Sequence, residues 1–401
     1  MTIADLQQLY ASHPHVEALV RVLEDDSVRR LYCGGLCASA PSLLSSVLVQ
    51  KAGKPFVFVL GDLEEAGYFY HDLVQVLGDG QVLFFPSSFR RAIKYGQKDA
   101  ANEILRTEVL GRLQKDADGW CVVTYPDALA EKVVSRRELD DNTLKLHAGE
   151  RVDMKFITDM LHTYGFEYVD YVYEPGQYAV RGSIIDVFSF SSEYPYRIDF
   201  FGDEVESIRT FEVESQLSKE PKNDIIIVPD LSRELERSGT DGMVSFLDFL
   251  PQDTVLVTSD FLWLRERIQQ VHDEALTPQA IAARAAEENG AISLDGKLIN
   301  GGEFTTRALD FRRMEFGHKP TGTPDATVMF DTCVQPIFHK NFDLVAESFK
   351  SYIEKGYTLY ICSDSSKQTD RIRAIFEDRG DRITFTAVER TVHEGFIDNT
   401  L

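Results

Sequence analysis

Apolar runs alternate with amphipathic stretches along most of the chain, and one unit of this pattern recurs three times. Each copy is an apolar strand that ends in a small residue and an aspartate, followed by a helix. The strands KPFVFVLGD, DTVLVTSD and YTLYICSD end at Asp62, Asp260 and Asp364. Each aspartate is predicted to cap its helix, because a carboxylate can accept a hydrogen bond from a free N–H of the first turn. Strands that alternate with helices indicate a parallel α/β sheet.

The same pattern predicts further strands at 29–35, 80–88 and 119–127 and an amphipathic helix at 97–113. Residues 144 to about 228 differ, because one helix (VDMKFITDMLHTYGF) is followed by short β runs with turn signals. This texture predicts an inserted α+β domain.

The composition of the GTPD stretch predicts a linker. A further small α/β unit is predicted to begin near Ala326, with the strands ATVMFD, TLYICSD and ITFTAV. We expect four parts: 1–142 and 229–325 as two parts of one α/β domain, 143–228 as the insertion, and 326–401 as a partial small α/β domain. The last part looks cut off in sequence, since no closing element follows its last strand.

The net charge of the chain argues against one class of function. The chain of 401 residues has 42 Lys and Arg against 65 Asp and Glu, a net charge of −23. A surface of this sign argues against nucleic-acid binding by the whole chain. There is no membrane-length apolar run and no signal peptide at the start, so we expect a cytoplasmic protein, a monomer with no membrane contact. The five cysteines lack metal-site spacing and are predicted to be reduced and buried.

The turn after the first strand, CGGLCASAPSLL, is where a nucleotide-hydrolysing domain would hold phosphate. Ala38, Ser39 and Ala40 stand where a Lys and a hydroxyl would be needed. Anion binding by the helix N-terminus is one interpretation, and an inert turn is the favoured one. We predict no catalytic residue, no metal site and no cofactor in this chain.

Arginines and a large aromatic residue gather in the insertion. Alternation in YRIDFF places Ile198 and Phe200 on one face of a strand and Arg197, Asp199 and Phe201 on the other. In YAVRGSIID the same rule groups Val180 with Ile184, and Arg181 with Ser183 and Ile185.

If the apolar face packs on the helix around Phe156, Met160 and Leu161, then Arg181, Arg197 and Phe201 point outward together. Two interpretations stay open at this point. Asp186 or Asp199 could pair with the arginines as ordinary surface ion pairs, worth about 0–1 kcal/mol. Alternatively, arginine and aromatic residues on one face form a protein-binding hot spot.

The stretch EPGQYAVRGSIIDVF…YPYRIDFFGDEVESIRTFE closely resembles the signature of the UvrB-like module, which the excision-repair protein UvrB shares with bacterial transcription-repair coupling factors. The resemblance implies a degenerate helicase-like (RecA-like) parallel-sheet domain with an inserted α+β domain, followed by a small α/β domain.

Two departures favour the coupling factors. UvrB has an intact phosphate loop in its first turn, and it has an aromatic-rich hairpin for DNA after its third strand. Here the first turn lacks the Lys, and LFFPSSFRRAIKYGQKDAA is predicted to pass straight to a helix. The sequence therefore resembles the amino-terminal module of a coupling factor, ending before the polymerase-binding and motor domains.

The resemblance implies a non-catalytic adaptor that recruits the damage sensor UvrA in transcription-coupled excision repair. The family positions that bind UvrA correspond to Arg181, Arg197 and Phe201. RNA polymerase and DNA would be contacted through domains absent here, and the full-length family protein is an ATP-dependent DNA translocase. The alternative is an ATP-dependent, DNA-binding excision-repair enzyme of the UvrB kind; a small-molecule binding protein is a third, weaker hypothesis.

Overall fold

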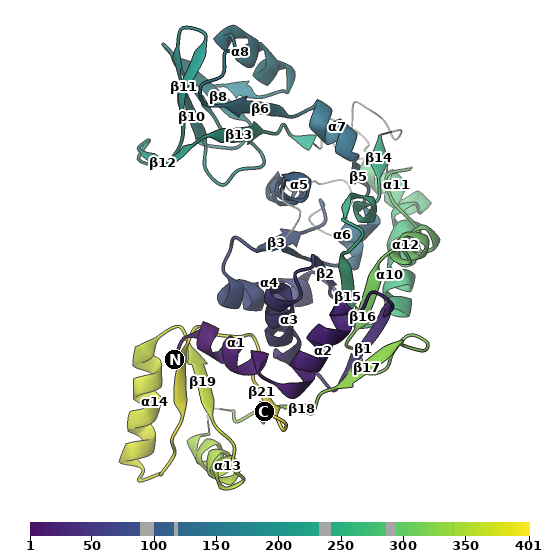
Figure 1. The fold of residues 1–401 in the computed structure, drawn as a ribbon, viewed down its shortest axis with the longest axis vertical. Coiled ribbons are helices and arrows are strands. Elements are labelled where there is room, and N and C mark those ends of the chain that lie inside the picture. Colours follow the sequence, from purple (N-terminus) through teal and green to yellow (C-terminus); the bar gives the residue numbers. More distant parts are fainter. Residues whose placement is uncertain (89–99, 116–118, 232–241, 286–293, 295, 340) are drawn as a thin grey trace.

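The computed structural model describes residues 1–88, 100–115, 119–231, 242–285, 294, 296–339 and 341–401. Figure 1 shows three groups of elements along the long axis: a central sheet with its helices, a second sheet beyond one end, and a small group formed by the last residues beyond the other end. In the part of the chain that the structure describes, no helix is long and apolar enough to cross a membrane.

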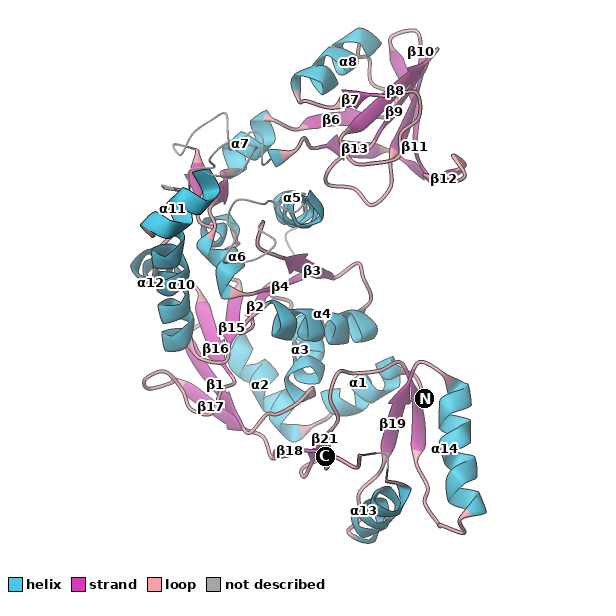
Figure 2. Cartoon of the chain, turned by 180° about the vertical axis from the view of Figure 1, so that it is seen from behind, coloured by secondary structure: helices cyan, strands magenta, loops and turns pink. Residues whose placement is uncertain are grey.

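The central sheet has the strand order β17-β1-β16-β15-β2-β4-β3, and all its pairings are parallel. Helices cover both faces, with α3 and α4 on one side and α10 and α12 on the other (Figures 1 and 2). Strands buried on both faces are almost entirely apolar, as in FVFV, CVVT and VLVT. The prediction of a parallel α/β sheet is confirmed. The strands are β1 (Arg30–Gly34), β2 (Phe56–Val59), β3 (Val82–Phe85), β4 (Cys121–Thr124), β15 (Val255–Thr258), β16 (Arg312–Glu315) and β17 (Ala326–Met329).

Three helices of the central unit, α4, α5 and α10, fall close to the stretches predicted after Asp62, at 97–113 and after Asp260. Residues 89–99, where the predicted helix at 97–113 begins and where UvrB would have its hairpin, lie outside the described residues. The helices are α1 (Ile3–Ala11), α2 (Pro14–Glu24), α3 (Ala40–Lys51), α4 (Leu63–Leu77), α5 (Ala100–Lys115), α6 (Pro126–Ala130), α7 (Arg136–Asp141), α10 (Phe261–Ala275), α11 (Pro278–Ala285) and α12 (Gly301–Ala308). Shorter elements complete the unit: β5 (Val133–Val134), β14 (Met243–Val244) and the 3-10 turn η1 (Phe246–Phe249).

Two of the three predicted aspartate caps are confirmed. Asp62 and Asp260 each accept a hydrogen bond of 2.9 Å from an N–H in the first turn of α4 and α10. The third prediction is wrong, because the N-cap position of α14 (Ser366–Asp378) is Ser365. The Asp364 carboxylate accepts a hydrogen bond from the Thr391 hydroxyl instead, at 3.2 Å.

The insertion, residues 144–227, leaves the central unit as one strand and returns as its antiparallel partner. β6 (Leu144–His147) and β13 (Asp224–Ile227) pair so that Leu144 lies opposite Ile227. Between them lie α8 (Met154–Thr163) and a six-stranded sheet in the order β12-β11-β10-β9-β8-β7. Its strands are β7 (Glu167–Tyr168), β8 (Gln177–Arg181), β9 (Ile184–Val187), β10 (Tyr196–Phe201), β11 (Glu204–Phe211) and β12 (Ser218–Lys222).

The helix α8 packs on one face of this sheet and forms a core separate from that of the central unit. Ile157 and Leu161 are fully buried in it, and Met160 packs against it at the edge. Phe156 was predicted to join this contact but is 52% exposed. The helical period explains the difference, because Ile157 and Leu161 are four residues apart on the buried stripe and Phe156 lies beside it.

The last residues form a small unit with its own core of Ala346, Phe376 and Ile383. Its strands β19 (Tyr360–Ser363) and β20 (Thr386–Glu389) are parallel, and β18 (Thr332–Val334) pairs with β21 (Phe396–Asp398). The helices α13 (Phe342–Glu354) and α14 lie beside them (Figure 2).

The prediction that ATVMFD opens this last unit is wrong. Residues Ala326–Met329 form β17, the edge strand of the central sheet beside β1. The GTPD stretch leads straight into this strand, and Asp325 accepts hydrogen bonds from the backbone N–H groups of Arg29 and Arg30, at 3.0 and 2.9 Å. Strand composition predicts that a strand exists but not which sheet accepts it, because pairing is decided at long range.

The cysteines are all free thiols, as predicted, but they are not all buried. Cys33 and Cys121 lie in the core, where burial raises the pKa of the Cys33 thiol to about 12. Cys333 is exposed. Within the described ranges, no group of three or more His, Cys, Asp or Glu side chains could hold a metal ion.

Candidate functional site: the outer face of the inserted sheet

The two faces of the inserted sheet differ in chemistry. The face against α8 is apolar and carries Ile185 and Ile198, both fully buried. We call the opposite side the outer face. It carries Arg181 of β8, Ile184 and Asp186 of β9, Arg197, Asp199 and Phe201 of β10, and Ser207 and Arg209 of β11.

Pairing across the first hairpin corrects one prediction. Simple alternation grouped Ile184 with Val180 and placed Ile185 with the arginine. In the structure Arg181 pairs with Ile184 and Val180 with Ile185, so Ile184 lies on the outer face and Ile185 is buried. Directly opposed residues of an antiparallel pair share a face. A count that continues through the two-residue turn at Gly182 loses this relation.

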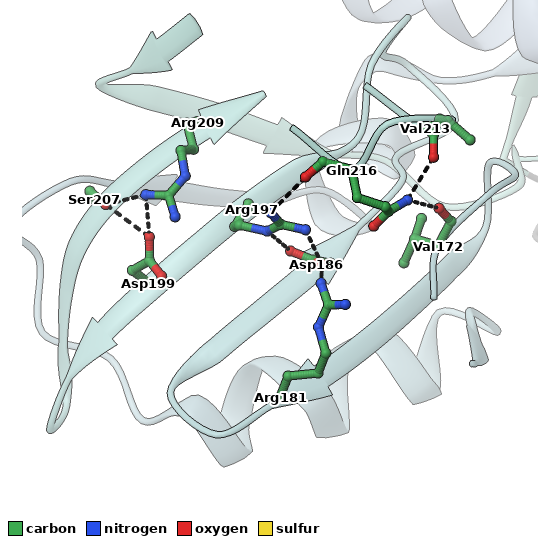
Figure 3. A network of polar contacts seen from close by, with 9 residues as sticks. All are labelled: Val172, Arg181, Asp186, Arg197, Asp199, Ser207, Arg209, Val213 and Gln216. Carbon is green, nitrogen blue, oxygen red and sulfur yellow. Dashed lines mark hydrogen bonds and ion pairs between the residues drawn. The ribbon is translucent and has the colours of Figure 1, made fainter. Parts of the chain in front are cut away.

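Asp186 lies at the centre of the outer face. Its side chain is fully buried, and its oxygens accept hydrogen bonds from Nε and Nη2 of Arg197, at 2.7 and 2.8 Å (Figure 3). An Nη2–H of Arg181 donates to the same carboxylate. Bidentate, charge-assisted bonds of this kind are strong and fix geometry. The interpretation as ordinary surface ion pairs therefore does not describe Asp186, because one partner is out of solvent.

Arg197 is held on several sides. Its Nη1 donates to the carbonyl of Gln216 at 3.1 Å, and its guanidinium lies 4.4 Å from the ring centre of Phe211. Hydrogen bonding to Asp186 raises the pKa of Arg197. The side chain is 12% exposed, so Arg197 lies on the predicted face but is covered, unlike Arg181 and Phe201. Residues 211–217 cover this part of the outer face, through contacts of Phe211 and Gln216 with Arg197. No periodic pattern of apolar residues in the sequence predicts this contact.

Arg181 and Phe201 lie at the open end of the outer face. Phe201 is 79% exposed, and the Arg181 side chain is 35% exposed. Each immediately precedes a two-residue turn that begins with a glycine at φ +62, Gly182 and Gly202. These turns lie at the same end of the sheet, because β8 and β10 are both antiparallel to β9 and so run in the same direction.

A second ion pair lies beside the first. Nη1 of Arg209 lies 2.5 Å from a carboxylate oxygen of Asp199, and the hydroxyl of Ser207 donates to the same oxygen at 3.1 Å (Figure 3). Asp199 was considered as a partner of Arg181 or Arg197, and it bonds Arg209 instead. Both aspartates of the outer face are thus neutralised by arginine.

The glycine-rich turn after β1 is occupied by the chain itself. The N–H of Cys37 donates to the Thr332 hydroxyl at 3.1 Å, and that hydroxyl donates to the carbonyl of Gly35 at 2.7 Å. A Cβ on Gly35 would lie 1.9 Å from the carbonyl oxygen of Phe330. Close approach by residues 330–332 is therefore sufficient reason for this glycine.

Residues 391–396 of the last unit lie across the start of α3. The N–H of Glu394 donates to the Ser39 hydroxyl at 3.0 Å, and that of His393 donates to the Asp72 carboxylate at 2.6 Å. The cavity left at this position measures about 430 Å³ and is lined by acidic side chains such as Glu65. Carboxylates repel an anion, so the lining disfavours a phosphate group.

Comparison with known proteins identifies the insertion. Residues 144–232 match the family model of the UvrB interaction domain. The chain contains a UvrB interaction domain. The outer face described above is one face of the sheet of this domain.

Similarity to known proteins extends beyond the UvrB interaction domain. The chain is 26% identical to the transcription-repair-coupling factor of Bacillus subtilis over an alignment 430 residues long, which covers 92% of this chain and 36% of that protein. It is 36% identical to that of Haemophilus influenzae over 198 residues (49% and 17%). It is also 26% identical to UvrABC system protein B of Streptococcus equi over 218 residues (51% and 32%).

The predicted resemblance to transcription-repair coupling factors is confirmed, and it covers most of the chain. The chain spans about a third or less of the length of these relatives, 36%, 17% and 32% in the order above. Activities and partners of the whole proteins are therefore not assigned to it by similarity.

Proposed function

We propose that this chain is a non-catalytic adaptor that binds UvrA through the outer face of its UvrB interaction domain and thereby links transcription to nucleotide excision repair. One observation carries the proposal: the most exposed aromatic ring of the domain, Phe201, stands at the same end of the sheet as Arg181, whose guanidinium is fixed by a buried carboxylate. The match to the UvrB interaction domain supports the assignment of the partner.

The exposed ring of Phe201 and the fixed guanidinium of Arg181 each favour binding, for different physical reasons. A large apolar ring in water gains free energy when a partner covers it, about 25 cal/mol per Å² of apolar surface. An arginine already held by Asp186 loses less conformational freedom on binding than a free one. Arginine and aromatic residues placed together are the usual make-up of binding hot spots.

The glycine-rich turn supports a role without nucleotide. The N–H of Cys37 and the carbonyl of Gly35 are bonded to Thr332, and the N–H of Glu394 is bonded to Ser39 at the start of α3. A Lys is missing where phosphate binding needs one. We propose that the chain carries no nucleotide and no other cofactor at this position.

A titration of purified UvrA with this chain tests the proposal. Phe201→Ala and Arg181→Ala are each expected to weaken binding by about 2 kcal/mol, roughly 30-fold. Phe156→Ala is the matched control, because Phe156 is also an exposed phenylalanine of the same domain but lies on α8, across the sheet. Binding by both outer-face variants with the affinity of the unaltered chain rejects the proposal.

The similarity to UvrABC system protein B supports a second candidate function, that of an ATP-dependent DNA enzyme of the UvrB kind. Turnover of ATP by the purified chain, with and without DNA, decides between them. We expect none above the rate in buffer, and steady hydrolysis that copurifies with the chain would favour the enzyme.

A further inference from the structure

The segment between β7 and β8 is fixed on the outer face by one buried residue. Val172 is fully buried in a small cluster with Ala179 and Phe211, and its carbonyl accepts a hydrogen bond from Nε2 of Gln216 at 3.4 Å. The N–H of Val169 donates to the carbonyl of Tyr178 at 2.9 Å. The residues around Val172 are thus held in place against the sheet.

This anchor brings Tyr171 under Arg181. The guanidinium of Arg181 lies 5.1 Å from the ring centre of Tyr171, and the tyrosine is 52% exposed. A cation over an aromatic face is attracted by the ring, which fixes the plane of the guanidinium. Arg181 is therefore held by a ring on one side and by Asp186 on the other.

The two arginines differ in what they can still offer. Arg197 uses Nε, Nη1 and Nη2 for bonds to Asp186 and Gln216. Arg181 uses Nη2 for Asp186, and among the described residues its Nε and Nη1 donate to no acceptor. Arg181 can therefore bond an incoming carboxylate with a geometry that is already set.

Ile184 connects this arginine to Phe201. It lies opposite Arg181 on β8 and opposite Asp199 on β10. Asp199 is two residues before Phe201 on β10, so these two side chains lie on the same face. Ile184 is half-buried, so part of its side chain remains in solvent. Asp199 is paired with Arg209, so Arg181 is the cation beside Tyr171 and Ile184, and Glu204 lies opposite Phe201 on β11.

We infer that Tyr171, Arg181, Ile184 and Phe201 form one continuous contact surface, the band, and that Arg197 and Asp186 position it without touching the partner. The inference rests on the proposed function and deepens it. Charge complementarity defines the occupant: a protein surface of UvrA that presents a carboxylate to Arg181 within an apolar area.

Titration of purified UvrA tests the contact role of Tyr171. Tyr171→Ala is expected to weaken binding about tenfold, whereas Tyr171→Phe, which keeps the ring under Arg181, stays within about twofold. Tyr173→Ala is the matched control, since Tyr173 flanks Val172 on the other side and is 56% exposed. Unchanged binding by Tyr171→Ala, or an equal loss from Tyr173→Ala, overturns the inference.

The positioning role of Arg197 is tested by a double-mutant cycle with Arg181. If Arg197 acts through Arg181, Arg197→Lys weakens binding in the unaltered chain but adds less than about twofold in Arg181→Ala. Additive losses would show direct contact and overturn the positioning role. Hydrogen exchange of β8–β10 in each variant confirms that the sheet is intact.

The two proposals fail in different ways. If Phe201→Ala and Arg181→Ala bind UvrA as the unaltered chain does, the proposed function fails. If these two lose affinity while Tyr171→Ala and Ile184→Ala do not, the outer face binds UvrA, but Tyr171 and Ile184 are not part of the contact surface and the further inference fails.

Discussion

At the scale of single residues, the outer face depends on a shared carboxylate. Asp186 is buried with guanidinium groups from β8 and β10, so the charge that would be costly to bury alone is compensated. The arrangement couples the position of Arg181 to that of Arg197. Arg181, whose side chain is 35% exposed, is thus held by a carboxylate that is fully buried.

Substitution of Asp186 measures that coupling. Asp186→Asn leaves two guanidinium groups around a neutral side chain and is expected to destabilise β8–β10 by about 3 kcal/mol, since removal of one partner of a buried pair is strongly destabilising. Amide hydrogen exchange of peptides from these strands should rise about a hundredfold. Asp199→Asn is the control, because its pair with Arg209 is nearer solvent, and a change of more than about 1 kcal/mol there would contradict this view.

Sequence reasoning placed Arg181, Arg197 and Phe201 on one face because alternation within a strand is reliable. It could not foresee that Arg197 is covered, since residues 211–217 have no period that shows where they fold. It also exchanged Ile184 with Ile185, because the count ran through a turn.

At the scale of elements, the strand–aspartate–helix pattern correctly predicted the parallel sheet and two of its three helix starts. The starts of α4 and α10 were predictable because the N-cap is a local interaction between residues three apart. The start of α14 was not, since Ser365 follows Asp364 and either can hold the cap position.

The difference between these caps is measurable. Asp260→Ala removes the hydrogen bond to the first turn of α10 and is expected to lower stability by about 1 kcal/mol. Asp364→Ala breaks no cap bond and is expected to cost less than half as much. Thermal melting followed by circular dichroism compares them, and equal losses would show that the cap assignment of α14 is wrong.

At the scale of the whole molecule, the last unit lies against the first helices. The His13 ring is fully buried, with its Nε2 at 3.5 Å from the Asp398 carboxylate of β21. Its Nδ1 accepts the N–H of His15 at 3.0 Å, which caps α2. No local pattern joins residues this far apart, so the sequence could not predict the contact, just as it misplaced β17.

This junction predicts a dependence of stability on pH. Burial lowers the pKa of His13 despite the opposing effect of Asp398, so the unfolded chain binds more protons than the folded one as pH falls below about 6.5. Stability from this group is therefore complete above that pH and is lost as pH decreases toward the lowered pKa. His13→Asn, which keeps a capping side chain, should flatten the fall in melting temperature between pH 7 and pH 5; an unchanged slope would contradict this.

The pairing of Leu144 with Ile227 has a mechanical consequence. Both strands that tether the insertion are anchored at the same end, so tension on a bound partner pulls β6 and β13 side by side in the same direction. Each carries part of the force, and the hydrogen bonds between them are not sheared. The inserted domain therefore transmits tension to the central unit while β6 and β13 stay paired.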